Sequence, residues 1–270
     1  MTRMIGLLHI FELLLPIAYA AVFALYLRQF LRDEERASRA ASHTLYVVLA
    51  AHALFFVLRG WELGFAPFAT KADFLSLVAL SIGAVYAVIE TSQLRGQTGV
   101  FFIAPALIGQ TVGSLLMGYD KKHPVLLENP IFGVHVVFLV LGLTALAVGA
   151  VYALMYVLMT RQLKARDLGV FFKRLPPLMQ LERMSKLGTV AGAALLGLGL
   201  GTGAVLGLTI EAFEMFDPKI IVSFVIWFGY LGGVLVSKLR GLSGVQTAWV
   251  TMIWFAIFLC SVGVANHSFL

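Results

Sequence analysis

Long, uninterrupted apolar runs dominate this chain, and polar residues gather in the short segments between them. Eight runs occur, at about residues 5–30, 43–63, 74–90, 100–117, 131–159, 187–210, 220–236 and 245–265. A transmembrane helix needs about 20 consecutive apolar residues, whereas the strands of a membrane barrel alternate apolar and polar side chains. The pattern therefore predicts an all-α fold, a polytopic membrane helical bundle with eight transmembrane helices.

The composition agrees with a membrane protein. Of 270 residues, 60% are hydrophobic and 13% are charged, whereas soluble domains carry about 25% charged residues. No polar stretch is long enough for a soluble domain, so we expect a single membrane-embedded domain over residues 1–270. The chain has one cysteine, Cys260, which lies inside an apolar run. A single cysteine excludes an internal disulfide and a redox pair.

The basic residues predict the orientation in the membrane. The net charge is +6, but the positive residues lie between apolar runs, which argues against a nucleic-acid partner. Of the 20 Lys and Arg residues, 14 lie at 28–39, 95, 161–186 and 238–240. Loops rich in Lys and Arg stay in the cytoplasm. We therefore expect both termini outside and a multi-pass protein of the inner (plasma) membrane.

The segment 160–186 is the largest expected cytoplasmic element. Pro176 and Pro177 interrupt a helix locally, and we expect residues 178–184 to lie as a short amphipathic stretch on the membrane surface. Two interpretations remain open for the segment, a charged connector or a docking site for a cytoplasmic partner. The run that follows contains seven glycines, which favour close helix packing or leave room for a flat cofactor.

Two histidines fall near the expected outer face, His135 at the start of the fifth run and His267 just after the eighth. Neutral imidazole is a standard axial ligand of haem iron, so this pair predicts either a bis-histidine haem site or hydrogen bonds at helix ends. Between them in sequence, residues 211–219 include Phe213 and Phe216, apolar side chains suited to cover a porphyrin face. Asp217 is expected to cap the next helix, with Pro218 at its first position.

His52 falls near the middle of the membrane, about 13 Å along its helix from His43. A histidine at that depth is unfavourable unless it is paired or bound to a metal. Arg59 and Glu62 follow it on the same run. A second haem site, an internal polar network and a single hydrogen-bonded histidine all remain open.

These residues carry a resemblance to a known family. Residues 129–161, NPIFGVHVVFLVLGLTALAVGAVYALMYVLMTR, resemble a helix that opens with a histidine in the cytochrome c assembly family, the CcsA and HemX type of haem-handling membrane protein. The segment LPPLMQLERMSKLGTVAGAALLGLGLGTGAV resembles the family's connector and its glycine-rich helix, and DPKIIVSFVIWFGYL resembles the helix after it. His267 in GVANHSF and His52 in AAHALFF fall on family histidines.

The resemblance implies a function in cytochrome c biogenesis. It implies that haem b is held near the outer face by His135 and His267, under the segment that contains Phe213, Phe216 and Asp217. Apocytochrome c and a ResB/CcsB-like membrane partner would then complete a cytochrome c haem lyase or synthase. Phenylalanines stand where the family has tryptophans, so two alternatives remain open, a HemX-like regulator of haem synthesis and a haem-less scaffold subunit.

Overall fold

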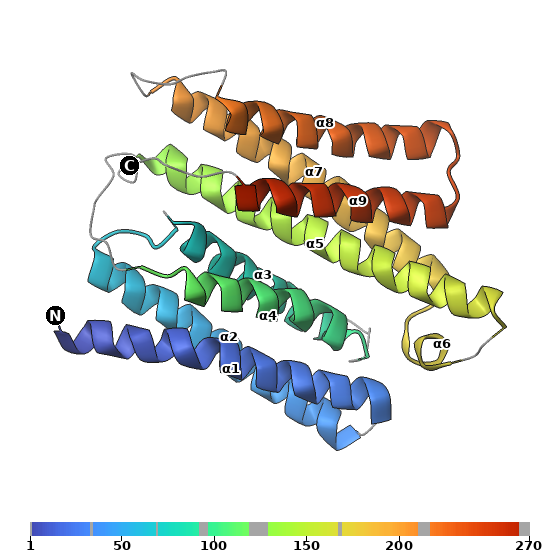
Figure 1. Ribbon diagram of the computed structural model, residues 1–270, viewed down its shortest axis with the longest axis horizontal. Helices are drawn as coiled ribbons and strands as arrows, with labels where there is room; N and C mark the ends of the chain where they lie inside the picture. Colours follow the sequence, from blue (N-terminus) through green and yellow to red (C-terminus); the bar gives the residue numbers. More distant parts are fainter. Residues whose placement is uncertain are drawn as a thin grey trace. The chain divides into compact units, whose positions relative to one another are not determined.

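A computed structural model of the protein describes residues 2–32, 35–68, 70–91, 97–118, 129–166, 169–209 and 217–264. Within these residues all regular structure is helical, which confirms the predicted all-α class (Figure 1). The helices are α1 (Thr2–Arg32), α2 (Glu35–Leu63), α3 (Lys71–Thr91), α4 (Gly99–Leu115), α5 (Pro130–Lys164), α6 (Val170–Arg174), α7 (Leu178–Gly207), α8 (Pro218–Leu239) and α9 (Gly244–Val264).

The predicted membrane spans correspond to eight of these helices. Seven helices in the described part of the chain are long and apolar enough to cross a membrane, and α4 is a shorter apolar helix of 17 residues. One local prediction was wrong: residues 178–184 form the first turns of α7 instead of a separate surface stretch. Pro177 immediately precedes the first residue of α7, where its missing N–H costs no helical hydrogen bond, so the helix can begin there.

The chain divides into two compact units, Met1–Leu127 and Glu128–Leu270. In the first unit α1 packs against α2 and α4, and α3 also packs against α2 and α4, so the four helices close a ring (Figure 1, blue to green). The single domain expected over residues 1–270 stays a prediction.

In the second unit the most extensive helix contact joins α5 and α7. Helix α9 packs against α5, and α8 packs against both α7 and α9 (Figure 1, yellow to red). Small residues allow α5 and α7 to approach closely: a Cβ atom at Gly149 would lie 2.9 Å from the backbone nitrogen of Thr189, and one at Gly188 would lie 2.8 Å from the carbonyl oxygen of Ala145. Close packing is therefore confirmed as a use of the glycines in α7.

Candidate functional site

The position of His135 follows from the start of α5. The side chain of Asn129 accepts a hydrogen bond from the backbone N–H of Ile131 at 3.0 Å, and Pro130 is the first helical residue. This N-cap satisfies a donor that the helix itself leaves unpaired. His135 therefore lies in the second turn of α5, as the sequence predicts.

The ring of His135 is oriented by α7. Its Nδ1 atom lies 2.8 Å from the carbonyl oxygen of Gly199. A carbonyl oxygen only accepts, so Nδ1 carries the hydrogen and Nε2 keeps a lone pair. Within the described residues, the hydrogen bonds to His135 include none to Nε2. Histidines that bind metals commonly donate their other ring N–H to a carbonyl or carboxylate in this way.

A second glycine of α7 makes room for this ring. A Cβ atom at Gly203 would lie 2.7 Å from Cε1 of His135 and 2.9 Å from its Nδ1. Real Cβ atoms essentially never approach so closely, so a larger residue at 203 would displace the imidazole. The glycines of α7 therefore serve two purposes, helix packing and placement of the histidine.

The other residues of the predicted haem site are described only in part. His267, Phe213 and Phe216 lie outside the described residues, so the pairing of the two histidines stays a prediction. Asp217 lies directly before α8, and its carbonyl oxygen accepts hydrogen bonds from the backbone N–H groups of Ile220 and Ile221 at 2.9 and 3.2 Å. Pro218 is the first residue of the helix, which confirms the predicted helix start.

His52 is fully buried in the first unit, and both of its ring nitrogens are engaged. Nδ1 lies 3.0 Å from the hydroxyl of Tyr19, and Nε2 lies 2.9 Å from the hydroxyl of Ser76. Ser76 donates its only proton to Gln110 at 2.8 Å, so it must accept from Nε2–H, and Nδ1 accepts from Tyr19. The four side chains come one each from α1, α2, α3 and α4, which supports the internal polar network among the open interpretations.

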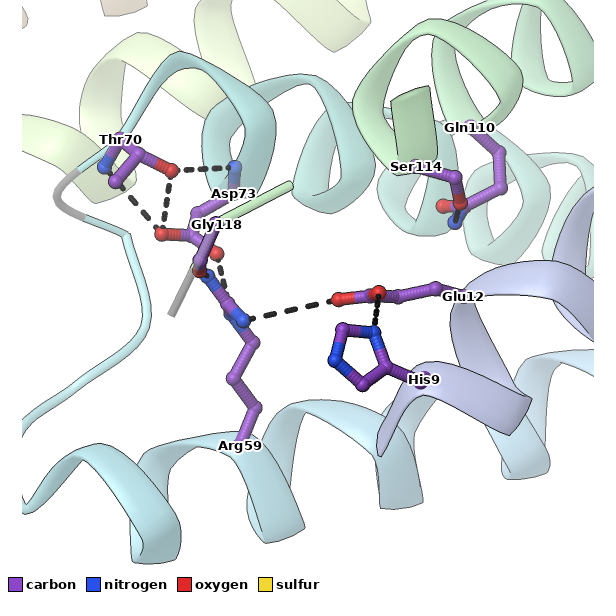
Figure 2. A network of polar contacts seen from close by, with 8 residues as sticks. All are labelled: His9, Glu12, Arg59, Thr70, Asp73, Gln110, Ser114 and Gly118. Atoms are coloured by element: carbon purple, nitrogen blue, oxygen red, sulfur yellow. Dashed lines mark hydrogen bonds and ion pairs between the residues drawn. The ribbon is translucent and has the colours of Figure 1, made fainter. Parts of the chain in front are cut away.

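A second polar cluster holds buried charges near one end of the four-helix ring in the first unit (Figure 2). The guanidinium of Arg59 on α2 donates from Nε to Asp73 on α3 at 2.7 Å and from Nη2 to the carbonyl of Gly118 at 2.9 Å. Glu12 on α1 lies 4.0 Å from Nη1 of Arg59 and 3.0 Å from Nδ1 of His9. Arg59 and Asp73 are each 1% exposed, so this cluster ties three helices together in a region of low dielectric.

Asp73 also caps its own helix. Thr70 precedes α3, and its hydroxyl accepts from the backbone N–H of Asp73 at 3.1 Å, while Oδ2 of Asp73 accepts from the backbone N–H of Thr70 at 3.3 Å. This is the reciprocal arrangement of a capping box. The carboxylate thus uses one oxygen for the cap and the other for Arg59.

Of the residues in these two clusters, Arg59 is predicted from the sequence as a neighbour of His52, whereas Tyr19, Glu12 and Asp73 are not. The signals were present: Glu12 is an acid inside the first apolar run, and Thr70 and Asp73 have the spacing of a capping box. Tyr19 gave no such signal, because tyrosine is common among apolar residues. Within the described residues no group of three or more His, Cys, Asp or Glu side chains is arranged to hold a metal ion.

Comparison with known proteins agrees with this architecture. The profile of a protein family described as "Cytochrome C assembly protein" matches residues 9–266. Protein HemX of Brevibacillus brevis is 28% identical over 217 residues, which is 76% of each chain. Protein HemX of Bacillus subtilis (strain 168) is 22% identical over 90% of each chain. Inner membrane protein YpjD of Escherichia coli (strain K12) is 28% identical over 89% of this chain and 90% of its own.

Proposed function

Because the chain belongs to the cytochrome c assembly protein family, we propose that it is a haem-binding membrane protein of cytochrome c biogenesis. It holds haem near the outer face of the inner membrane for delivery or attachment to apocytochrome c. The single observation that carries the proposal is the orientation of His135, whose Nδ1 donates to Gly199 and whose Nε2 is left with a lone pair for iron.

The residues present fit a haem of this kind. His135 is held by two elements of the second unit, α5 through its backbone and α7 through the Gly199 carbonyl. His267 is proposed as the ligand on the opposite face of the iron. Phe213 and Phe216 are proposed to cover the porphyrin, with Asp217 at the start of the next helix. When bound, haem supplies the iron and the vinyl groups to which apocytochrome thiols add.

The contribution of the chain itself is to place and shield the haem. A fixed imidazole tautomer presents Nε2 in one orientation, and the apolar residues of α5 and α7 limit the access of water. Covalent attachment would require apocytochrome c and a ResB/CcsB-like membrane partner. The basic segment 160–186 is proposed as a contact for a cytoplasmic partner.

The test is the absorbance spectrum of the full-length protein purified in detergent. We expect a haem Soret band that is lost in His135→Ala and in His267→Ala and is retained in His43→Ala. His43 is a matched control because it is exposed on α2 and its Nδ1 bonds the carbonyl of Arg39 in its own helix. Added imidazole should restore the band in His135→Gly. A protein that lacks haem, or a band unchanged in His135→Ala, would contradict the proposal.

A second experiment addresses delivery. We expect covalent cytochrome c to form when the protein is co-expressed with a ResB/CcsB-like partner and an apocytochrome, and to be lost in His135→Ala. If haem binds but no cytochrome c forms, and deletion instead changes the rate of haem synthesis, the HemX-like regulator is the better description. A stable complex without haem would favour the scaffold subunit.

A further inference from the structure

The second unit contains a cavity that the haem proposal does not use. It has a volume of about 260 Å³ and lies between α7, α8 and α9. Lys186 and Lys238 line one end, and the walls include Val190, Val234, Val250 and Trp254. The hydroxyls of Thr189, Thr247 and Thr251 also line the cavity, but most of the remaining lining is apolar. Basic residues at one end and mainly apolar walls match a molecule with an anionic head and an apolar tail.

The two lysines at the basic end differ in how far their charges are compensated by nearby carboxylates. Nζ of Lys186 lies 2.7 Å from Oε1 of Glu182, so that charge is compensated within the protein. Lys238 is exposed, and within the described residues no ion pair to it is found. Ser237, next to it, adds a hydroxyl to the lining. Lys238 therefore gives this end of the cavity a net positive charge.

The depth of the cavity suits part of an acyl chain. Tyr230, at its far end, precedes Lys238 by eight residues, which is about 12 Å along a helix. Leu235 is 55% exposed beside the lining, so an apolar tail can continue along the surface of α8. Among the described residues, the lining supplies no His, Met or Cys, the usual protein ligands of haem iron besides tyrosine.

The expected topology identifies the class of ligand. Lys186 and Lys238 belong to the loops that the positive-inside rule places in the cytoplasm. The cytoplasmic leaflet is rich in anionic lipids, and basic pockets between transmembrane helices on that side bind their head groups. We propose that this cavity binds an acidic phospholipid, with its phosphate at Lys238 and Ser237 and an acyl chain along Val234 and Val250.

The test is lipid binding to the full-length protein, measured by native mass spectrometry with phosphatidylglycerol or phosphatidylcholine. We expect Lys238→Gln to weaken phosphatidylglycerol binding about fivefold, with little change for phosphatidylcholine. Arg240→Gln is the matched control, because Arg240 is exposed two residues away and does not line the cavity. A second variant, Val234→Phe, should expel the acyl chain, whereas Val236→Phe, outside the lining, should not.

Several outcomes would overturn the proposal. Equal affinities for the two lipids, or equal effects of Lys238→Gln and Arg240→Gln, would show that the cavity does not recognise an acidic head group. Competition by inorganic phosphate at millimolar concentration would indicate a phosphate site instead. Competition by haem that is lost in Lys238→Gln would assign the cavity to haem. Melting temperatures of all variants, measured alongside, establish that each is folded.

Discussion

The Nδ1 atom of His135 lies 2.8 Å from the carbonyl oxygen of Gly199, across the most extensive helix contact of the second unit. Residues in mid-helix normally use their carbonyls within the helix, so a carbonyl that also accepts from a neighbouring imidazole requires close approach of the two helices. That approach depends on small residues in α7. The orientation of the proposed haem ligand is therefore a consequence of α5–α7 packing.

The first prediction concerns the glycine beneath the imidazole. In Gly203→Ala the new methyl group would lie 2.7 Å from Cε1 of His135, so the ring must move and its bond to Gly199 must break or lengthen. We expect loss of most of the haem absorbance and a destabilisation of about 1–3 kcal/mol from overpacking. The measurement is the ratio of Soret to protein absorbance, together with the melting temperature.

Gly201→Ala is the matched control for this variant. Gly201 lies two residues away on α7, and a Cβ atom there would have no described neighbour within 4 Å beyond its own stretch of helix. Alanine is also the better helix former, so we expect unchanged haem content and equal or slightly higher stability. Equal losses of haem in both variants would mean that the contact between Gly203 and His135 does not determine haem binding.

The second prediction separates a structural His52 from a haem ligand. Tyr19→Phe leaves Nδ1 of His52 without its donor, and hydrogen bonds of this kind inside membrane proteins contribute about 0.6 kcal/mol on average, with a maximum near 1.7. We expect a destabilisation in that range and no change in haem absorbance. Tyr46→Phe, at an exposed position of α2, should change stability by less than about 0.5 kcal/mol.

The same prediction extends to the histidine itself. His52→Ala removes a ring that contacts both Tyr19 and Ser76, so we expect a larger loss of stability, about 2–4 kcal/mol, with haem retained. If His52→Ala instead lowers the haem content and leaves the melting temperature unchanged, a second haem site is the correct interpretation.

The helices could be predicted from the sequence because membrane solvation leaves few alternatives. Apolar runs of about 20 residues must satisfy their backbone groups internally, so each predicted run appears as a helix. The start of α8 was also predicted from the sequence: the pair Asp217-Pro218 indicates a helix that begins at Pro218, and α8 begins there. The prediction of a separate surface stretch at residues 178–184 was wrong, because proline is compatible with a helix that begins directly after it and the stretch continues into α7.

The pairing of polar side chains could not be predicted in the same way. The depth of His52 showed that it needs partners, but not that Tyr19 and Ser76 would supply them from two other helices. Such partners depend on how the helices are rotated about their axes, and nearly uniform apolar surfaces leave that rotation undetermined. The hydrogen bond from His135 to Gly199 could not be predicted for a further reason: its acceptor is a backbone oxygen, which every residue has.

The third prediction is the orientation in the membrane. In a Cys260→Ser background, single cysteines at Lys173 and Arg240 should react with a membrane-impermeant maleimide only after the cells are opened, because both positions belong to the expected cytoplasmic loops. A cysteine at Lys71, on the opposite side, should react in intact cells. Labelling of Lys173 in intact cells would reverse the topology and place the cavity of α7, α8 and α9 at the outer leaflet.

The fourth prediction concerns the buried ion pair of the first unit. Asp73→Asn weakens the acceptor 2.7 Å from Nε of Arg59 and leaves a buried guanidinium under-compensated, since Glu12 is 4.0 Å away. Breaking a buried pair by removing one charge costs about 3–5 kcal/mol. Glu182→Gln, in the exposed pair with Lys186, should cost less than about 1 kcal/mol.

Replacing both Arg59 and Asp73 shows whether the two side chains stabilise the protein through their ion pair or only through packing. In Arg59→Met combined with Asp73→Asn, no unpaired charge remains between these two positions, so stability should recover part of the loss seen in either single variant. The double-mutant cycle, measured by thermal unfolding in detergent, gives the coupling energy directly. A coupling near zero would mean that Arg59 is stabilised mainly by Glu12 and the Gly118 carbonyl, so that the capping role of Asp73 alone accounts for its effect.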